Sequence, residues 1–175
     1  MSWNFKFFQR INALVGKNHW LDAFGRAGAE FVIFAMVGWY ITADLVTFRP
    51  DWADVFRPLI TLGVMALGGW LLNIWLGIIV KEPRPHVTHP ESKLLFKPWM
   101  SWKSFPSDHA MLAWLVFFAA LLFNLPFAWS LFFMALWVSW SRVFAGVHYP
   151  VDILGGATVA GIIVIIASHV LTWRF

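Results

Sequence analysis

Long stretches with few or no charges dominate the hydrophobic pattern of this chain. A helix needs about 20 consecutive apolar residues to cross the roughly 30 Å hydrocarbon core of a bilayer. Five stretches approach this length and predict five membrane-spanning helices, at about residues 27–47, 59–80, 110–125, 127–141 and 153–173. A turn at Asn124 and Pro126 is expected between the third and fourth. The pattern therefore predicts an all-α, polytopic membrane helical bundle.

The N-terminal segment has a different pattern. Residues 3–15 alternate aromatic and aliphatic side chains with polar ones, which predicts an amphipathic helix lying in the membrane interface. This segment is too short to span, and no part of the chain has the features of a cleaved signal peptide. We expect residues 1–175 to form a single domain.

Composition narrows the class of protein and the chemistry. The chain is 60% hydrophobic and 13% charged, which excludes an ordinary soluble domain. It has no cysteine, so a disulfide framework, a thiol nucleophile and a cysteine metal site are excluded. The net charge of +4 favours anionic partners, and lipid head groups are the nearest anions to a membrane protein. Nucleic acid is not an expected partner.

The polar clusters fall where the predicted topology brings them together. Five spans alternate in direction, so the end of span two, the start of span three and the connection between spans four and five share one face. The clusters there are Lys81-Glu82-Pro83-Arg84-Pro85, residues 104–109, Ser141-Arg142, and His148 with Asp152. This convergence predicts a functional site at one end of the bundle.

The basic residues of these clusters predict a site for a phosphate group. Guanidinium binds phosphate oxygens through two parallel hydrogen bonds, which suits Arg84 and Arg142, and Lys81 adds a cation. Ser107 is expected to cap the following helix, whose first N–H groups would also face the anion. The alternative is contact with lipid head groups, which we favour for Lys93, Lys97 and Lys103.

His148 and Asp152 have the spacing of a nucleophile and its orienting carboxylate. A carboxylate four residues on, itself an expected helix cap, can accept the Nδ1 proton and leave Nε2 free to attack. His109 on the same face can serve as the general acid, and two such groups predict a bell-shaped pH dependence with limbs near 6.5. For the remaining histidines we expect packing or interfacial roles: His19, His86, His89 and His169.

The same groups leave a metal site as an alternative. His109, His148 and Asp152 are possible ligands, but the nearby cations already supply the positive charge that a metal would bring. We expect no metal and no cofactor.

At these residues the chain resembles the type 2 phosphatidic acid phosphatase (PAP2) family, whose motifs read approximately Lys-x6-Arg-Pro, Pro-Ser-Gly-His and Ser-Arg-x5-His-x3-Asp. The third motif is complete, from Ser141 to Asp152, and the second has Asp108 in place of glycine. In the first motif Gly77 stands at the lysine position, and Lys81 is the expected substitute. The form of the second motif is similar to the undecaprenyl-diphosphate phosphatases associated with bacitracin resistance.

The resemblance implies a role for each matching residue. His148 would be the nucleophile, Asp152 its orienting partner and His109 the acid, and the family's phosphate ligands would be Arg84, Ser107 and Arg142. It implies a helical bundle in which the N-terminal interfacial helix stands in for the first span. Hydrolysis would pass through a phosphohistidine that water then attacks.

Two acidic residues are predicted to line the site. Glu30 lies within a predicted span, where a carboxylate is costly and usually functional. We expect it to line the site or to pair with one of its cations, or else to have no role. Asp108 is the other candidate, through its position in the second motif.

The resemblance implies a substrate and a location. The substrate would be undecaprenyl diphosphate in the cytoplasmic membrane, with the active site on the outer face and a role in cell-wall peptidoglycan synthesis. The positive-inside rule points the other way, because ten of the 13 Lys and Arg residues lie on the active face by this topology. Alternatives are phosphatidylglycerophosphate, phosphatidate or a lipid A phosphate as substrate, or a non-enzymatic anion-binding protein. Oligomeric state is not predicted.

Overall fold

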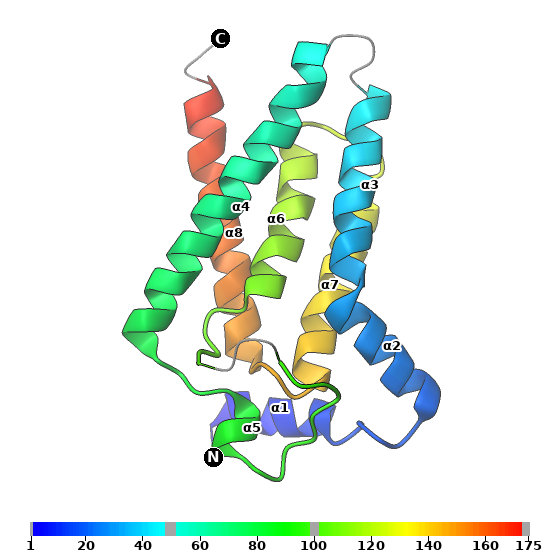
Figure 1. The fold of residues 1–175 in the computed structure, drawn as a ribbon, viewed down its shortest axis with the longest axis vertical. Coiled ribbons are helices and arrows are strands. Elements are labelled where there is room, and N and C mark those ends of the chain that lie inside the picture. The colour runs from blue at the N-terminus through cyan, green and yellow to red at the C-terminus, as the bar shows by residue number, and fades with distance from the viewer. Residues whose placement is uncertain (1, 48–51, 99–101, 173–175) are drawn as a thin grey trace.

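The computed structural model describes residues 2–47, 52–98 and 102–172, and every regular element in them is a helix (Figure 1). The prediction of an all-α protein is confirmed. The helices are α1 (Trp3–Asn12), α2 (His19–Glu30), α3 (Val32–Thr47), α4 (Trp52–Val80), α5 (Pro85–Thr88), α6 (Asp108–Leu122), α7 (Ala128–Phe144) and α8 (Pro150–Thr172).

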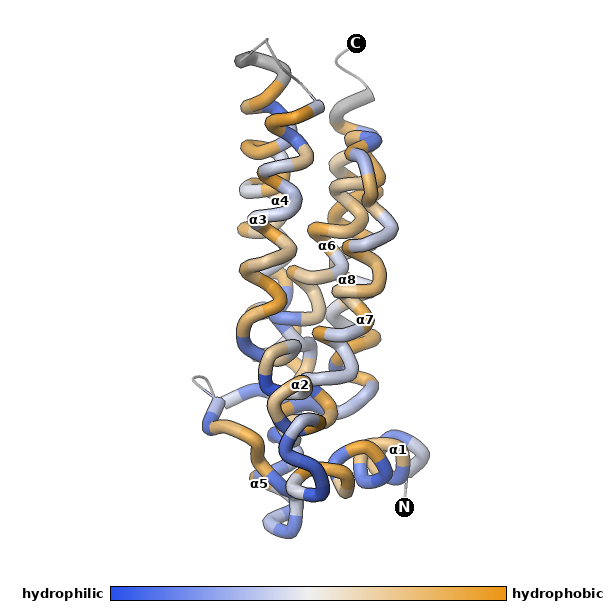
Figure 2. Tube along the Cα trace, turned by 90° about the vertical axis from the view of Figure 1, so that its right-hand side faces the viewer, coloured by the Kyte–Doolittle hydropathy of each residue, from blue (hydrophilic) through white to orange (hydrophobic). Residues whose placement is uncertain are grey.

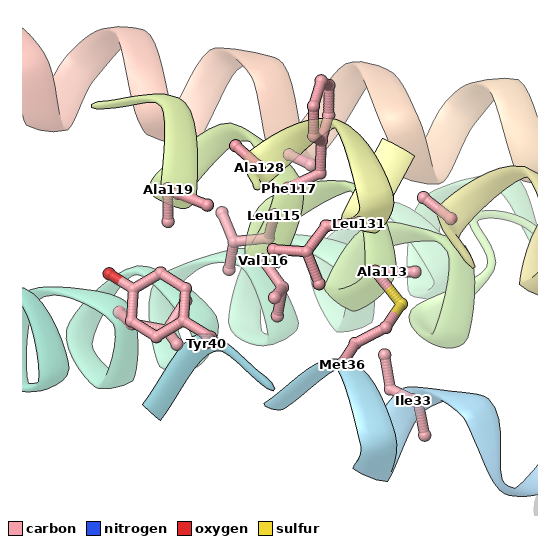
Figure 3. Close-up of a cluster of buried hydrophobic side chains, with 14 of the residues drawn as sticks. Ile33, Met36, Tyr40, Ala113, Leu115, Val116, Phe117, Ala119, Ala128 and Leu131 are labelled. Atoms are coloured by element: carbon pink, nitrogen blue, oxygen red, sulfur yellow. The ribbon is translucent and has the colours of Figure 1, made fainter. Parts of the chain in front are cut away.

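Five of these helices, α3, α4, α6, α7 and α8, run along the long axis of the molecule, and α6 packs against each of the other four (Figure 1). Helix α6 is apolar around most of its circumference, as expected for a helix buried on all sides. Its Leu115 and Val116 contribute to the core with Met36 and Tyr40 of α3 and Leu131 of α7 (Figure 3). The core therefore holds the helix that begins at the second motif.

The first predicted span is wrong in one respect, because the helix is broken. Phe31 separates α2 from α3, and the two helices are bent by 53°. Gly25 and Gly28 of α2 lie against Phe144 and Ser141 of α7, where a Cβ atom would collide. This close packing draws α2 across the end of α7, while α3 continues along the bundle (Figure 1).

Two helices in the described residues are long and apolar enough to cross a membrane, at Val55–Thr88 and Pro150–Val170, and the bent pair α2 and α3 adds a third if it is one span. Helix α6 has 15 residues, or about 22 Å at 1.5 Å per residue, which is short of the hydrocarbon thickness. The count of five spans stays a prediction. Pro126 lies in the turn between α6 and α7, as expected, and Trp173 and Arg174 lie outside the described residues.

Helix α1 lies across the end of the bundle where the polar clusters gather (Figures 1 and 2). Its Phe5 and Phe8 are buried, and the Phe8 ring contacts Tyr149. Trp3 and Phe7 on the other side are 63% and 51% exposed. One apolar face of the helix thus packs on the protein, and the amphipathic helix in the membrane interface stays a prediction.

Candidate active site

A cavity of about 300 Å³ opens at the polar end of the bundle. Side chains from α2, α6, α7 and three connecting segments line it, although they are far apart in sequence. These lining residues are Glu30, Arg84, Phe96, Lys97, Pro98, Asp108, His109, Arg142 and His148. The fold therefore brings together the clusters that the predicted topology placed on one face.

His148 is buried between a carboxylate and a guanidinium. Its Nδ1 atom lies 3.4 Å from Oδ2 of Asp152, and its Nε2 atom lies 3.4 Å from Nη1 of Arg84. Because Nδ1 faces a carboxylate, the tautomer with the proton on Nδ1 is favoured. Nε2 then carries the lone pair, on the side where a phosphate bound to Arg84 would lie.

Asp152 is not the cap residue that the sequence predicted. Helix α8 begins at Pro150, so Asp152 is the third helical residue, and its Oδ2 accepts a hydrogen bond from the Tyr149 N–H at 2.7 Å. The same oxygen accepts from the Ser104 hydroxyl at 2.5 Å. A carboxylate at the third position satisfies the free N–H at the helix start, as in a capping box. These two donors fix the carboxylate beside His148.

Arg84 and Arg142 are both buried at the cavity, each about 4% exposed. Nη1 of Arg84 donates to the Val147 carbonyl and Nη1 of Arg142 donates to the Ala29 carbonyl, both at 3.0 Å. Nε of each arginine has no hydrogen-bond partner among the described residues. Each guanidinium is thus held by backbone and retains donors for an anion in the cavity.

The surroundings of His148 favour its neutral form. Burial lowers the pKa of the His148 imidazole well below its usual 6.5, and the positive charges of Arg84 and Arg142 lower it further. The unprotonated nitrogen is the form that can attack phosphorus. The structure therefore favours an unprotonated His148 at neutral pH, as its predicted role requires.

His109 and Asp108 belong to the first turn of α6, and both line the cavity. The predicted cap at Ser107 is confirmed, because its hydroxyl accepts a hydrogen bond from the Ala110 N–H. Ser107 is completely buried and is not one of the cavity-lining residues, so its role as a phosphate ligand stays a prediction.

Lys81 does not lie in the site. It follows the last residue of α4, its side chain is exposed, and it is not among the residues that line the cavity. Its backbone adopts a positive φ of 53° and its N–H bonds the Gly77 carbonyl. Helix α4 ends at Val80, and the exposed side chain of Lys81 is not part of the cavity wall.

The three lysines assigned to lipid head groups lie in different surroundings. Lys97 lines the cavity. Lys93 donates to the Val15 carbonyl at 2.6 Å, next to Asn12, whose side chain bonds the Lys93 backbone. Lys103 is only 1% exposed and pairs with Asp108 at 2.9 Å. Asp108 was visible in the motif, but sequence spacing alone did not show which lysine would pair with it.

Glu30 lies at the end of α2 and lines the cavity, as expected. It forms an ion pair with Arg26, whose Nε lies 2.7 Å from its carboxylate. Arg26 is more exposed than Glu30, so the pair runs from the cavity wall toward the surface.

The other histidines are not among the residues that line the cavity. The His89 ring stacks on Phe5 at 3.8 Å and its Nδ1 lies 3.5 Å from Glu91, which is a packing role as predicted. His19 is exposed at the start of α2. Across the described ranges, no three His, Asp or Glu side chains are grouped so that they could hold a metal ion. The absence of a metal requirement stays a prediction.

The helical bundle thus holds a buried histidine beside two arginines at one end. Residues 57–175 match the PAP2 superfamily, and the chain belongs to that family of membrane lipid phosphatases. It is a multi-pass membrane protein.

Two curated relatives carry related names. The chain is 31% identical over 160 residues to undecaprenyl-diphosphatase BcrC of Bacillus subtilis, covering 91% of this chain and 80% of the relative. It is 34% identical over 155 residues to a protein of Bacillus licheniformis named bacitracin transport permease protein BcrC, covering 88% and 73%.

Two solved structures share the fold. Aquifex aeolicus LpxE superposes with a TM-score of 0.72 at 26% identity, covering 95% of this chain and 94% of that one. A PAP2-type phosphatidylglycerolphosphate phosphatase from Bacillus subtilis superposes with a TM-score of 0.53 at 24% identity, covering 98% and 94%. The second likeness concerns the fold alone.

Proposed function

We propose that the protein hydrolyses undecaprenyl diphosphate to undecaprenyl phosphate and inorganic phosphate. The observation that carries the chemistry is the placement of His148 between Asp152 and Arg84 in a cavity that a second arginine also lines. The named B. subtilis relative supports the substrate, because it is an undecaprenyl-diphosphatase and aligns with most of this chain.

In the first half of the reaction, Nε2 of His148 attacks the terminal phosphorus. The bond from phosphorus to the bridging oxygen breaks, and His109 donates a proton to the departing lipid monophosphate. Arg84 and Arg142 bind the phosphoryl oxygens, on which negative charge is spread in the transition state. Asp152 stabilises the Nδ1–H tautomer and the positive charge that develops on the ring.

In the second half, water attacks the phosphohistidine. The histidine that gave up its proton, His109, accepts a proton from this water, and the bond from phosphorus to Nε2 breaks. Inorganic phosphate leaves and His148 returns to its neutral form. Both halves use the chain's own residues, so we expect activity in the presence of a chelator.

The proposed location is the cytoplasmic membrane, with the cavity on its outer face and five spans in one domain of residues 1–175. The five helices that run along the long axis would be these spans, with α2 and α3 forming a single broken one (Figure 1). Helix α1 would lie in the interface, and the polyprenyl tail would lie in the bilayer beside the bundle. Cell-wall peptidoglycan synthesis and bacitracin resistance are the expected biological contexts.

The test is phosphate release from undecaprenyl diphosphate by the purified protein in detergent with EDTA. We expect release by the wild type, none by His148→Ala, and wild-type release by His19→Ala, whose histidine is exposed on α2. Phosphatidylglycerophosphate, phosphatidate and lipid A are assayed in parallel. A faster reaction with one of these would replace the proposed substrate, and loss of activity in EDTA would contradict a metal-independent reaction.

A second candidate function is transport or anion binding without hydrolysis. The name of the B. licheniformis relative, a bacitracin transport permease protein, favours it. Binding alone needs neither a buried histidine next to a carboxylate nor a second histidine in the cavity. A folded wild type that releases phosphate from none of the four lipids would favour this function.

A further inference from the structure

Lys103 is an ammonium group buried at the edge of the candidate active site. Its side chain is 1% exposed, and its Nζ atom donates to Oδ1 of Asp108 at 2.9 Å and to the Pro106 carbonyl at 3.0 Å. Removing a charge from water is costly unless it is paired and hydrogen-bonded. The two partners thus hold Lys103 in one position.

The stem of Lys103 fills the space above Gly77. A Cβ atom at Gly77 would lie 2.5 Å from Cδ of Lys103, and also close to Trp102 and to the Phe105 carbonyl. Position 77 is seven residues before Arg84, which is where the first PAP2 motif has its lysine. The segment that ends at the second motif therefore brings a lysine into the place that a side chain at position 77 would occupy.

Asp108 explains why this lysine is needed. It stands where the second motif has glycine, and it lines the cavity with His109 and the two arginines. An uncompensated carboxylate there would repel a phosphate. Oδ1 of Asp108 accepts from Lys103 and also from the Asn73 amide at 3.0 Å, so its negative charge is compensated by the ammonium group.

The charge of Lys103 also acts on the nucleophile. It is one of the positive charges that lower the pKa of His148, after burial and the two arginines, and it opposes the carboxylate of Asp108, which raises this pKa. Its effect on His148 is the same in sign as theirs, because each cation favours the neutral imidazole.

We propose that Lys103 is the positioning cation of this phosphatase site: it replaces the lysine absent at Gly77, neutralises Asp108 and contributes its field to His148. The inference rests on the proposed phosphatase function. The chain departs from the family motifs at Gly77 and at Asp108, and Lys103 compensates for both: its stem fills the space beside Gly77, and its ammonium group pairs with Asp108.

The experiment removes Lys103 and places a lysine at position 77 instead. One variant, Lys103→Ala with Asp108→Gly, removes both members of the pair, so that no buried charge is left without a partner. A second variant adds Gly77→Lys to these two changes. We expect the first to lower kcat/KM about 10- to 100-fold, the scale of one lost hydrogen bond between charged groups, and the second to regain most of this loss.

The pH profile separates this role from a structural one. In the pair-deleted variant the acid limb of kcat/KM should move to lower pH, because Asp108, which raises the pKa of His148 more than Lys103 lowers it, is gone. Adding Gly77→Lys should move the limb to still lower pH, because a cation near His148 favours the neutral imidazole. Wild-type kcat/KM after pair deletion, or no recovery on adding Gly77→Lys, would overturn the inference.

A stability measurement tests whether the Lys103 side chain occupies the space next to Gly77, and it does not depend on activity. Gly77→Ala should lower the melting temperature of the wild type and have little effect after Lys103→Ala and Asp108→Gly, because the colliding stem is then absent. Equal effects in both backgrounds would contradict the placement of Lys103. The two proposals fail in different ways. If the wild type releases no phosphate from any lipid, the proposed function is wrong. If the wild type is active and the pair-deleted variant is equally active, only the Lys103 inference is wrong.

Discussion

At the residue scale, burial and neighbouring charges decide which side chains can react. His148 has Asp152 on one side and Arg84 on the other, and its pKa is lowered by burial and by the two arginines. Lys81, the lysine nearest to Arg84 in sequence, is exposed, whereas Lys103 is buried at the cavity edge. Distance along the chain was therefore a poor guide to which lysine is buried beside a cavity-lining residue.

The pKa of His148 predicts where the acid limb of the activity profile lies. Because the nucleophile must be neutral and its folded pKa is below 6.5, lowering the pH from 7 to 6.5 should leave kcat/KM nearly unchanged, with the decline at lower pH. A steady-state profile on undecaprenyl diphosphate measures this. An acid limb at or above 6.5 would contradict the structure, although the sequence alone predicted limbs near that value.

The same shift predicts a pH dependence of stability. The unfolded chain binds a proton at His148 near pH 6.5, while the folded chain binds it only at lower pH, so the free energy of unfolding should fall as the pH drops below about 6.5. Melting temperatures in detergent between pH 8 and 5 should therefore fall less in His148→Gln than in the wild type. Identical slopes would show that His148 does not contribute.

Lys81 provides a sharp negative prediction. Since its side chain is exposed and does not line the cavity, Lys81→Gln should keep kcat/KM within about twofold of the wild type, as for most surface changes. Arg84→Gln, three residues on, should lower it by at least about 100-fold, because it removes a buried charged donor to the phosphate. A large loss in Lys81→Gln would return this residue to the site.

At the element scale, the contact between α2 and α7 positions one wall of the site. Gly25 and Gly28 allow α2 to approach α7, and the Ala29 carbonyl that follows accepts a hydrogen bond from Arg142. The break at Phe31 lets α2 keep this contact while α3 continues along the bundle. The apolar period of residues 27–47 gave no sign of the break, because both helices are apolar enough to read as one span.

A methyl group at Gly28 should therefore disturb the site through packing. Gly28→Ala places a Cβ atom 2.5 Å from Nε1 of Trp137 and against the Ser141 hydroxyl, and we expect a loss of roughly 1–3 kcal/mol in stability with lower turnover. The control is Gly38→Ala in α3, where no atom lies within 4 Å of the new methyl group. Thermal unfolding and phosphate release are measured on both. Equal behaviour of the two variants would contradict the close α2–α7 contact.

At the scale of the whole molecule, the polar residues gather at one end of the bundle, where α1, α2 and α5 lie (Figure 2). Ten of the 13 Lys and Arg residues were predicted on this side, but Arg84 and Arg142 among them are buried at the cavity, and Lys103 is buried beside Asp108. Basic residues that are needed to bind an anion are present whichever way the protein is inserted. They therefore say less about orientation than loop lysines and arginines do, and the positive-inside argument is weaker. Arg49 and Arg174, predicted on the other side, lie outside the described residues.

Sidedness can be measured directly because the chain has no cysteine. We expect Lys6→Cys, exposed on α1 at the cavity end, to react with an impermeant thiol reagent added to intact cells. Ser130→Cys, exposed near the opposite end at the start of α7, should react only after the cells are opened. The reverse pattern would place the cavity in the cytoplasm and exclude the proposed outer-face site.

The sequence by itself determined the helical class, the apolar stretches and most of the reactive residues. Helical stretches follow from local hydrophobicity, and His148, Asp152, Arg84 and Arg142 were visible because their motifs have fixed spacing. Tertiary structure alone decided that the first span is broken, that Lys103 is buried and paired with Asp108 whereas Lys81 is exposed, and that Asn73 donates a hydrogen bond to Asp108. The physical reason is that packing distances and burial act between segments remote in sequence, where local pattern carries no information about contact.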